Sequence, residues 1–231
     1  MAPLTPPGAS LGPHPLIEWG TAQSVLAGQS VSGDRYLLRP YPDGLLVAVV
    51  DGLGHGEMAA AAADIAVATL ETHSREPVIP LLERCHVALK RTRGAAISVA
   101  SFSAMYESMT WLGVGNVEGV LLRADVKAIP AQELIMLFPG VAGYQLPYLR
   151  AVVTPVKRGD VVIFFTDGIR RDFLSEPIPA GSPELIAGHI CDKYKRSTDD
   201  ALVFVGRYLG SGRNRLVKGK SWVHFRHRLD R

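Results

Sequence analysis

Acidic side chains placed directly after apolar runs are the residues of this sequence whose type and spacing best fit chemistry. Leu45–Val50 is a run of six apolar residues, Asp51 follows at once, and Gly52, Gly54 and Gly56 come within the next five positions. Such a run is typical of a strand buried on both faces. A carboxylate there costs free energy unless a cation, a basic partner or a helix N-terminus neutralises it. Taken alone, this stretch is more typical of a structural turn than of a site.

The same device recurs at places far apart in the chain. The acidic positions are Asp34 ahead of Tyr36–Arg39, Asp51, Asp167 after the apolar run that starts at Val161, and Asp199-Asp200 ahead of Ala201–Val205. If the strands pack together, these carboxylates converge at strand ends. Several carboxylates and a glycine carbonyl, with no cysteine cluster, form a hard-oxygen site that suits Mg²⁺ or Mn²⁺.

The ordered set of short motifs resembles the metal-dependent PPM (type 2C) serine/threonine phosphatases. It is most like their small bacterial branch, the SpoIIE-like and RsbX-like enzymes. The motifs are Ser32–Asp34, Val49–Gly56, Phe165–Ile169 and Asp199–Ala201, and the segments Leu112–Val117 and Arg158–Asp160 also fit that branch. Each motif is unspecific alone, so the resemblance depends on their order over nearly the whole chain, from about Glu18 to Tyr208.

The resemblance implies a site for two divalent ions, Mn²⁺ or Mg²⁺, with Asp51 bridging them. The implied metal ligands are Asp34, Asp51, Gly52 through its carbonyl, Asp167 and Asp200. Asp199 is either a ligand or a supporting residue, and we prefer Asp200 because it adjoins the strand. Two such ions offset the charge of a phosphate monoester and lower the pKa of a water molecule that attacks phosphorus. By contrast, we expect Asp160 to be structural and Asp172 to lie on the surface.

Asp51 and His55 are the candidate catalytic residues. His55 lies four positions after Asp51, where larger relatives place a histidine two positions on, so it is a candidate proton donor. Its alternatives are capping the following helix or having no role. Larger relatives also bind phosphate with an arginine that has no secure counterpart here. Arg35, Arg170 and Arg171 are the nearby cations, and the last two equally fit a solvated helix start.

Composition predicts one globular domain with no membrane span. The chain has 231 residues, of which 47% are hydrophobic, and no apolar run reaches the roughly 18 residues that a membrane span needs. The first residues lack the pattern of a secretory signal, and Cys85 and Cys191 fit small buried residues. We expect a mobile proline-rich arm at 1–15, a phosphatase domain at 16–210 and a basic tail at 211–231. The tail holds seven Lys/Arg and one Asp, which leaves the rest at −3, so the body is not a nucleic-acid binder.

Strand and helix patterns predict an α+β fold with antiparallel sheets. Strands are expected at 17–26, 36–39, 45–50, 95–103, 108–114, 117–123, 132–137, 161–166 and 201–208, and helices at 57–73, 79–91 and 183–194. Gly115-Asn116 is a tight-turn signal between two of the strands, and Ser182 is a plausible helix N-cap. The resemblance refines this to a β-sandwich of two antiparallel sheets flanked by α-helices, without the flap subdomain of larger relatives.

The resulting hypothesis is a monomeric, cytoplasmic phosphatase for phosphoserine and phosphothreonine. The likeness to RsbX-like enzymes implies that phosphorylated STAS-domain proteins of a bacterial stress-signalling complex, the stressosome, are its partners, with neither membrane nor nucleic acid involved. Their dephosphorylation would reset the pathway. Two alternatives stay open: a phosphatase-like module that binds phosphoproteins without turnover, and a metal-dependent hydrolase of small phosphoesters. Retention of all four acidic sites argues against the binding module.

Overall fold

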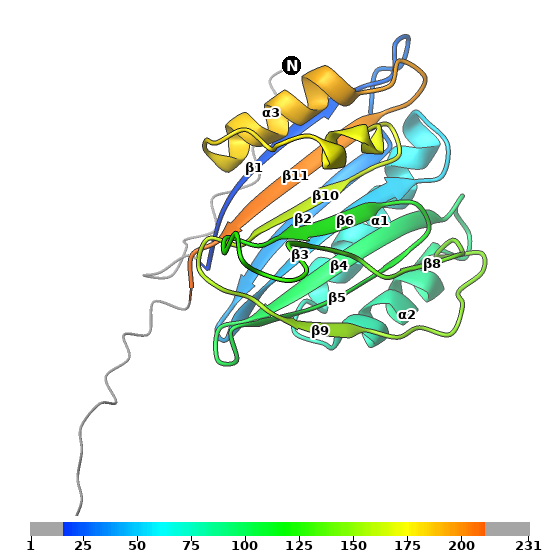
Figure 1. The fold of residues 1–231 in the computed structure, drawn as a ribbon. Coiled ribbons are helices and arrows are strands. Elements are labelled where there is room, and N and C mark those ends of the chain that lie inside the picture. Colours follow the sequence, from blue (N-terminus) through cyan, green and yellow to red (C-terminus); the bar gives the residue numbers. More distant parts are fainter. Residues whose placement is uncertain (1–15, 211–231) are drawn as a thin grey trace, which may run out of the picture.

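Two β-sheets packed face to face, with helices on both outer faces, make up the molecule (Figure 1). Figure 1 shows a computed structural model, and the structure describes residues 16–210. The predicted arm at 1–15 and tail at 211–231 lie outside the described residues. The layers therefore run helix, sheet, sheet, helix, which confirms the predicted α+β sandwich.

The two sheets are built mostly from antiparallel pairs. The first sheet has the order β1 (Ile17–Ser24), β11 (Ala201–Tyr208), β10 (Val161–Phe165), β6 (Glu118–Leu122), β7 (Gln132–Leu134). The second has the order β2 (Asp34–Tyr41), β3 (Gly44–Gly52), β4 (Ala95–Ser103), β5 (Ser108–Val114), β8 (Leu137–Phe138), and β9 (Val152–Pro155) also pairs with β5. Only the short pairing between β5 and β8 is parallel within residues 16–210.

Helices cover the outer face of each sheet. Helices α1 (Glu57–Thr72) and α2 (Val78–Leu89) pack on the second sheet, and α3 (Pro183–Tyr194) packs on the first, after the short 3₁₀ helix η1 (Arg171–Ser175). The side chain of Ser182 accepts a hydrogen bond from the backbone N–H of Leu185, so the predicted N-cap is confirmed. Across residues 16–210, every helix is too short or too polar to traverse a lipid bilayer.

Three apolar cores hold the layers together. Large side chains, among them Trp111, Phe164 and Phe204, fill the space between the sheets. The core under α1 instead contains Ala62, Ala63 and Ala66. Alanine favours a helix and its short side chain lets the helix lie close to the sheet. Both cysteines are buried and free, as predicted.

Two predictions about strand pairing are wrong. The strand after Gly115-Asn116 does not form a hairpin with β5, because β6 pairs with β10 and β7 in the other sheet. The predicted strand 132–137 is split, with β7 in the first sheet and β8 in the second. In both places the chain crosses between sheets, and a local sequence pattern reports strand propensity but not the partner. The helix η1 was not predicted.

We predict opposite effects of Gly→Ala changes at Gly20, where α3 packs on β1, and at Gly188 within α3, which faces open space. A Cβ on Gly20 of β1 would lie 2.3 Å from the Cα of Glu184, so Gly20→Ala forces α3 away and costs about 1–3 kcal/mol. Gly188 in α3 has open space at the same atom, so Gly188→Ala stabilises by about 0.5–1 kcal/mol. Urea unfolding measures both. Equal effects of the two variants would contradict the close approach of α3.

Candidate metal centre

The predicted acidic residues lie at one end of the sandwich, where β3 and β10 end and β2 and β11 begin. Asp34 opens β2 directly opposite Asp51 at the end of β3. In the other sheet, Asp167 follows the end of β10, and Asp199-Asp200 precede the neighbouring strand β11. The antiparallel pairing of each strand pair therefore delivers carboxylates from both sheets to the same edge, as the sequence predicts.

Thr166 ties the two sheets together beneath these carboxylates. Its hydroxyl donates to Oδ2 of Asp34 at 2.8 Å and accepts from the backbone N–H of Leu202 at 2.9 Å. Thr166 and Asp34 are both buried. Asp34 on β2 is thereby fixed to the ends of β10 and β11. Sequence reasoning did not assign Thr166 a role, and its only signal was its place next to Asp167.

Both carboxylate oxygens of Asp200 accept hydrogen bonds from the backbone. Its Oδ1 accepts from the N–H of Leu26 at 2.8 Å, and its Oδ2 accepts from the N–H of Gly33 at 2.7 Å. Asp200 thus holds the segment between β1 and β2 in place. Asp199 instead is only half-buried, and its Oδ1 accepts from the N–H of Asp200. Of the two, Asp199 has the carboxylate better placed to bind a ligand, whereas the sequence analysis preferred Asp200.

Asp167 is exposed and oriented by two neighbours. The side-chain amide of Asn116 donates to its Oδ2 at 2.6 Å, and Nε of Arg196 donates to its backbone carbonyl at 3.0 Å. Gly168 lies so close to β11 that a Cβ there would be 1.8 Å from the carbonyl oxygen of Asp200. Any other residue would separate the two turns. In the sequence, Asn116 is notable only as part of the segment Leu112–Val117 and of a predicted turn, so its contact with Asp167 was not predicted.

Two carboxyl groups at this edge have a strongly raised pKa. Burial, and after it the charges of Asp34, Asp167, Asp199 and Asp200, together raise the pKa of Asp51 to about 8. Burial and nearby carboxylates similarly raise the pKa of Asp34 to about 7, against the opposing hydrogen bond from Thr166. Asp51 has no hydrogen-bond or ion-pair partner within the described part of the chain. Such crowding of negative charge is what a bound cation would relieve.

The donor set fits a divalent cation of the hard-oxygen class. Asp34, Asp51, Asp167 and Asp199 offer carboxylate oxygens that are held by strand ends, and oxygen ligands suit Mg²⁺ and Mn²⁺. Within residues 16–210 no three His, Cys, Asp or Glu side chains close around a single point as they stand. Mutual repulsion of uncompensated carboxylates is a physical reason for that spacing.

His55 and the nearby arginines have different surroundings. His55 is exposed, and its charge lowers the pKa of Asp199, which burial raises. It does not cap α1, because no side chain does so, which removes one of the three alternatives. Arg35 pairs with Asp64 at 2.6 Å. Arg171 pairs with Glu118 at 2.9 Å.

Asp160 and Asp172, the two aspartates expected to lie outside the site, do lie outside it. Asp160 is buried, pairs with Arg123 and accepts from the N–H groups of Ala124 and Lys157, so it is structural. Asp172 is exposed and lies 3.6 Å from Nε of Arg170. Neither contributes to the cluster at the sandwich edge.

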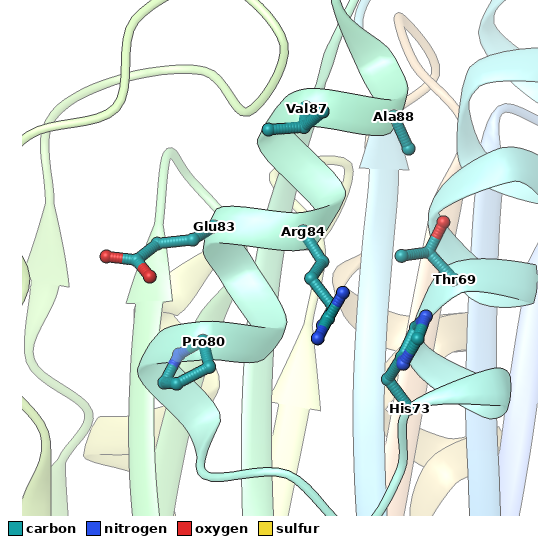
Figure 2. A pocket seen from close by; sticks show the side chains of 7 residues that line it. All are labelled: Thr69, His73, Pro80, Glu83, Arg84, Val87 and Ala88. Carbon is teal, nitrogen blue, oxygen red and sulfur yellow. The ribbon is translucent and has the colours of Figure 1, made fainter.

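A hollow of about 500 Å³ lies elsewhere, between α1 and α2 on the outer face (Figure 2). Its lining is Thr69, His73, Pro80, Glu83, Arg84, Val87 and Ala88. Figure 2 shows the side chain of Glu83 directed away from those of Arg84 and His73. Arg84 and His73 both pair with Glu76. With a single acidic side chain in its lining, this hollow does not offer the ligands of a metal centre.

The model of the stage II sporulation protein E (SpoIIE) family matches residues 41–204, a span that includes Asp51, Asp167 and Asp199-Asp200. The chain belongs to the SpoIIE family. This is a family of metal-dependent PPM (type 2C) serine/threonine phosphatases. The predicted family, enzyme class and dependence on a divalent metal are therefore confirmed at the family level.

Individual relatives agree with the family. The phosphoserine phosphatase RsbX of Bacillus subtilis (strain 168) is 25% identical over 181 residues, which cover 77% of this chain and 87% of RsbX. A crystal structure of RsbX in complex with magnesium has a TM-score of 0.71 at 27% identity, covering 83% of this chain and 95% of RsbX. A structure from work on the bacterial stressosome, as a modular system adapted to control secondary messenger signalling, has a TM-score of 0.74 at 28% identity and covers 83% of this chain and 99% of its own.

We predict that the two adjacent aspartates separate into a structural and a metal-binding residue. Asp200→Asn places an amide N–H₂ against a backbone N–H and costs about 1–3 kcal/mol of stability. Asp199→Asn keeps an oxygen that accepts from the N–H of Asp200, so stability changes by less than about 1 kcal/mol. Thermal unfolding with and without Mn²⁺ then distinguishes them: Asp199→Asn loses the stabilisation by Mn²⁺. Full Mn²⁺ stabilisation of Asp199→Asn would refute this division.

A second prediction concerns the pH dependence of stability in a metal chelator. The pKa of Asp51 is about 8 in the folded protein and about 3.9 in an unfolded chain. The folded state therefore binds more protons between these values, so stability is lost as the pH rises from about 4 to 8. Asp51→Asn reduces this loss without abolishing it, because the raised pKa of Asp34 still contributes, and its free energy of unfolding exceeds that of wild type by at least about 1 kcal/mol at pH 8. Urea unfolding of both proteins at pH 5 and pH 8 measures this effect. If the free energy of unfolding falls as much between the two pH values in Asp51→Asn as in wild type, the prediction is contradicted.

Proposed function

We propose that this chain is a Mn²⁺- or Mg²⁺-dependent phosphatase for phosphoserine or phosphothreonine in proteins. The observation that carries the proposal is the cluster of carboxylates from four strand ends, with Asp51 unpartnered at its centre. The RsbX name and the magnesium-bound RsbX structure support phosphoserine chemistry with a divalent ion. The bacterial stressosome relative supports partners in a signalling complex.

The proposed substrates are phosphorylated STAS-domain proteins of a stressosome in the cytoplasm, whose dephosphorylation resets the pathway. The segment from Asp167 to Asp200 holds only η1 and α3, and thus leaves no flap over the site. An open site favours a folded protein as substrate, because specificity then depends on contacts around the phosphorylated residue. We propose that the enzyme acts as a monomer.

Two ions are proposed, with ligands divided between the two sheets. Asp34, Asp51 and the carbonyl of Gly52 would hold one, and Asp51, Asp167 and Asp199 would hold the other. Asp199 replaces Asp200 in this proposal, because both oxygens of Asp200 accept backbone hydrogen bonds. Divalent ions supply charge neutralisation and a more acidic water for attack on phosphorus.

The chain's own residues prepare this site. Thr166 fixes Asp34, and Asn116 orients Asp167, so both carboxylates are held at the shared edge. His55 is exposed beside Asp199 and is proposed to donate a proton to the leaving serine or threonine oxygen.

The decisive experiment is phosphate release from a phosphorylated STAS-domain protein with Mn²⁺, with Mg²⁺ and with a chelator. We expect release that needs the metal and falls at least about 100-fold in Asp51→Asn. Asp172→Asn is the matched control, because this exposed aspartate lies outside the cluster and should keep full activity. Equal release by wild type and Asp51→Asn would refute the phosphatase.

Parallel assays distinguish the alternatives. Turnover of aryl phosphates with none of phosphoprotein would indicate a hydrolase of small phosphoesters. Binding of phosphoprotein and of Mn²⁺ without any release would indicate a binding module. Calorimetric titration with Mn²⁺ alone tests the centre independently of turnover.

A further inference from the structure

The cluster of carboxylates poses an electrostatic problem for its substrate. A phosphate monoester arrives with negative charge at an edge that carries Asp34, Asp51, Asp167 and Asp199. Divalent ions offset part of this charge, but oxygens that they do not contact need another partner. Arginine is well suited, because its planar guanidinium donates two parallel hydrogen bonds to phosphate oxygens. The inference below rests on the proposed phosphatase function and concerns which arginine supplies them.

The arginines considered from the sequence are already engaged. Arg35 pairs with Asp64 and also donates to the carbonyls of Ser32 and Asp34, so it braces the start of β2. Arg171 pairs with Glu118, and Arg170 donates to the carbonyl of Lys193. Each would have to give up a protein partner before binding substrate.

Arg93 is free and lies beside residues 52–56, which follow Asp51 and are called the metal loop here. It precedes β4, whose first residue Ala95 is opposite Gly52 in the register of β3 and β4. The residues just before β4 therefore run alongside the loop after Gly52. A Cβ placed on Gly54 would lie only 2.6 Å from Nη1 of Arg93. Arg93 is exposed, and within residues 16–210 its side chain has no hydrogen bond or ion pair.

The turn that carries Arg93 is fixed on both sides. The hydroxyl of Thr92 donates to the carbonyl of Leu89 and accepts from the N–H of Gly94. The carbonyl of Gly94 accepts from the N–H of Leu53 at 3.0 Å, which joins this turn directly to the metal loop. The backbone that carries Arg93 is thus fixed beside the loop, while no carboxylate among the described residues binds its guanidinium.

Gly54 makes room for that guanidinium. Its φ of +91° is unfavourable for residues with a side chain, and any Cβ there would collide with Arg93. The glycine thereby allows an unpaired cation to lie against the backbone, three residues after Asp51.

We propose that Arg93 binds the phosphate oxygens of the substrate, and so supplies the phosphate contact from the turn between α2 and β4. The class of ligand is a phosphate monoester dianion or the inorganic phosphate product. Arg196 also lies at this edge, but its Nε donates to the carbonyl of Asp167, so it supports a metal ligand.

The test compares Arg93→Ala with Arg91→Ala in the full-length protein. Arg91 is exposed, carries the same charge and lies two positions earlier on the same turn, so it is a control for long-range electrostatics. Calorimetry measures inorganic phosphate binding to each Mn²⁺-loaded protein, and kinetics measures KM for the phosphoprotein. We expect Arg93→Ala to lower the affinity for inorganic phosphate and to raise KM, each by about 10- to 100-fold, as for loss of a charged hydrogen bond. Arg91→Ala should change them less than about 3-fold, and Mn²⁺ affinity should stay unchanged in both.

Arg93→Lys adds a test of geometry. Lysine keeps the charge but loses the planar fork, so it should restore only part of the binding. Equal phosphate binding by wild type and Arg93→Ala would overturn the inference even if the enzyme is a phosphatase. An equal loss in Arg91→Ala would also overturn it, since net charge alone would then explain the effect. Weaker phosphate binding in Arg93→Ala alone would support it even if wild type released no phosphate, which would refute only the proposed function.

Discussion

Mutual repulsion of carboxylates at a partly buried edge is the constraint on which the rest of this structure depends. Hydrogen bonds hold two of them in place: Thr166 donates to Asp34, and Asn116 donates to Asp167. Asp51 receives none within residues 16–210, and its pKa is raised to about 8, compared with about 7 for Asp34. The electrostatic repulsion therefore acts most strongly on Asp51. Strand ends that belong to continuous hydrophobic cores supply the rigidity that this arrangement requires.

Much of this could be predicted from local pattern. Continuous apolar runs marked β3, β10 and β11, and alanines marked α1, because burial on both faces and helix propensity leave direct traces in sequence. Pairing left no such trace. The hairpin expected at Gly115-Asn116 is absent because β6 joins the other sheet, and that choice depends on cross-sheet packing of residues far apart in the chain.

The site shows the same division between residue type and contact. The acidic strand ends were identifiable, since a charge after an apolar run is costly without a partner. The distinction between Asp199 and Asp200 was not, because it depends on the N–H groups of Leu26 and Gly33, which come from the other end of the chain. Thr166 and Arg93 were missed for the same reason: their importance lies in neighbours that only the fold brings near.

The position of β11 has a consequence for biosynthesis. This strand lies between β1 and β10, and its partner β1 is made before every other described strand. Until the ribosome releases residues 201–208, β1 lacks its hydrogen-bonding neighbour, and the loop between β1 and β2 lacks the carboxylate that anchors it. Folding of the first sheet therefore requires contacts of long sequence separation, which form late. A nascent chain would acquire a competent centre only after β11 emerges.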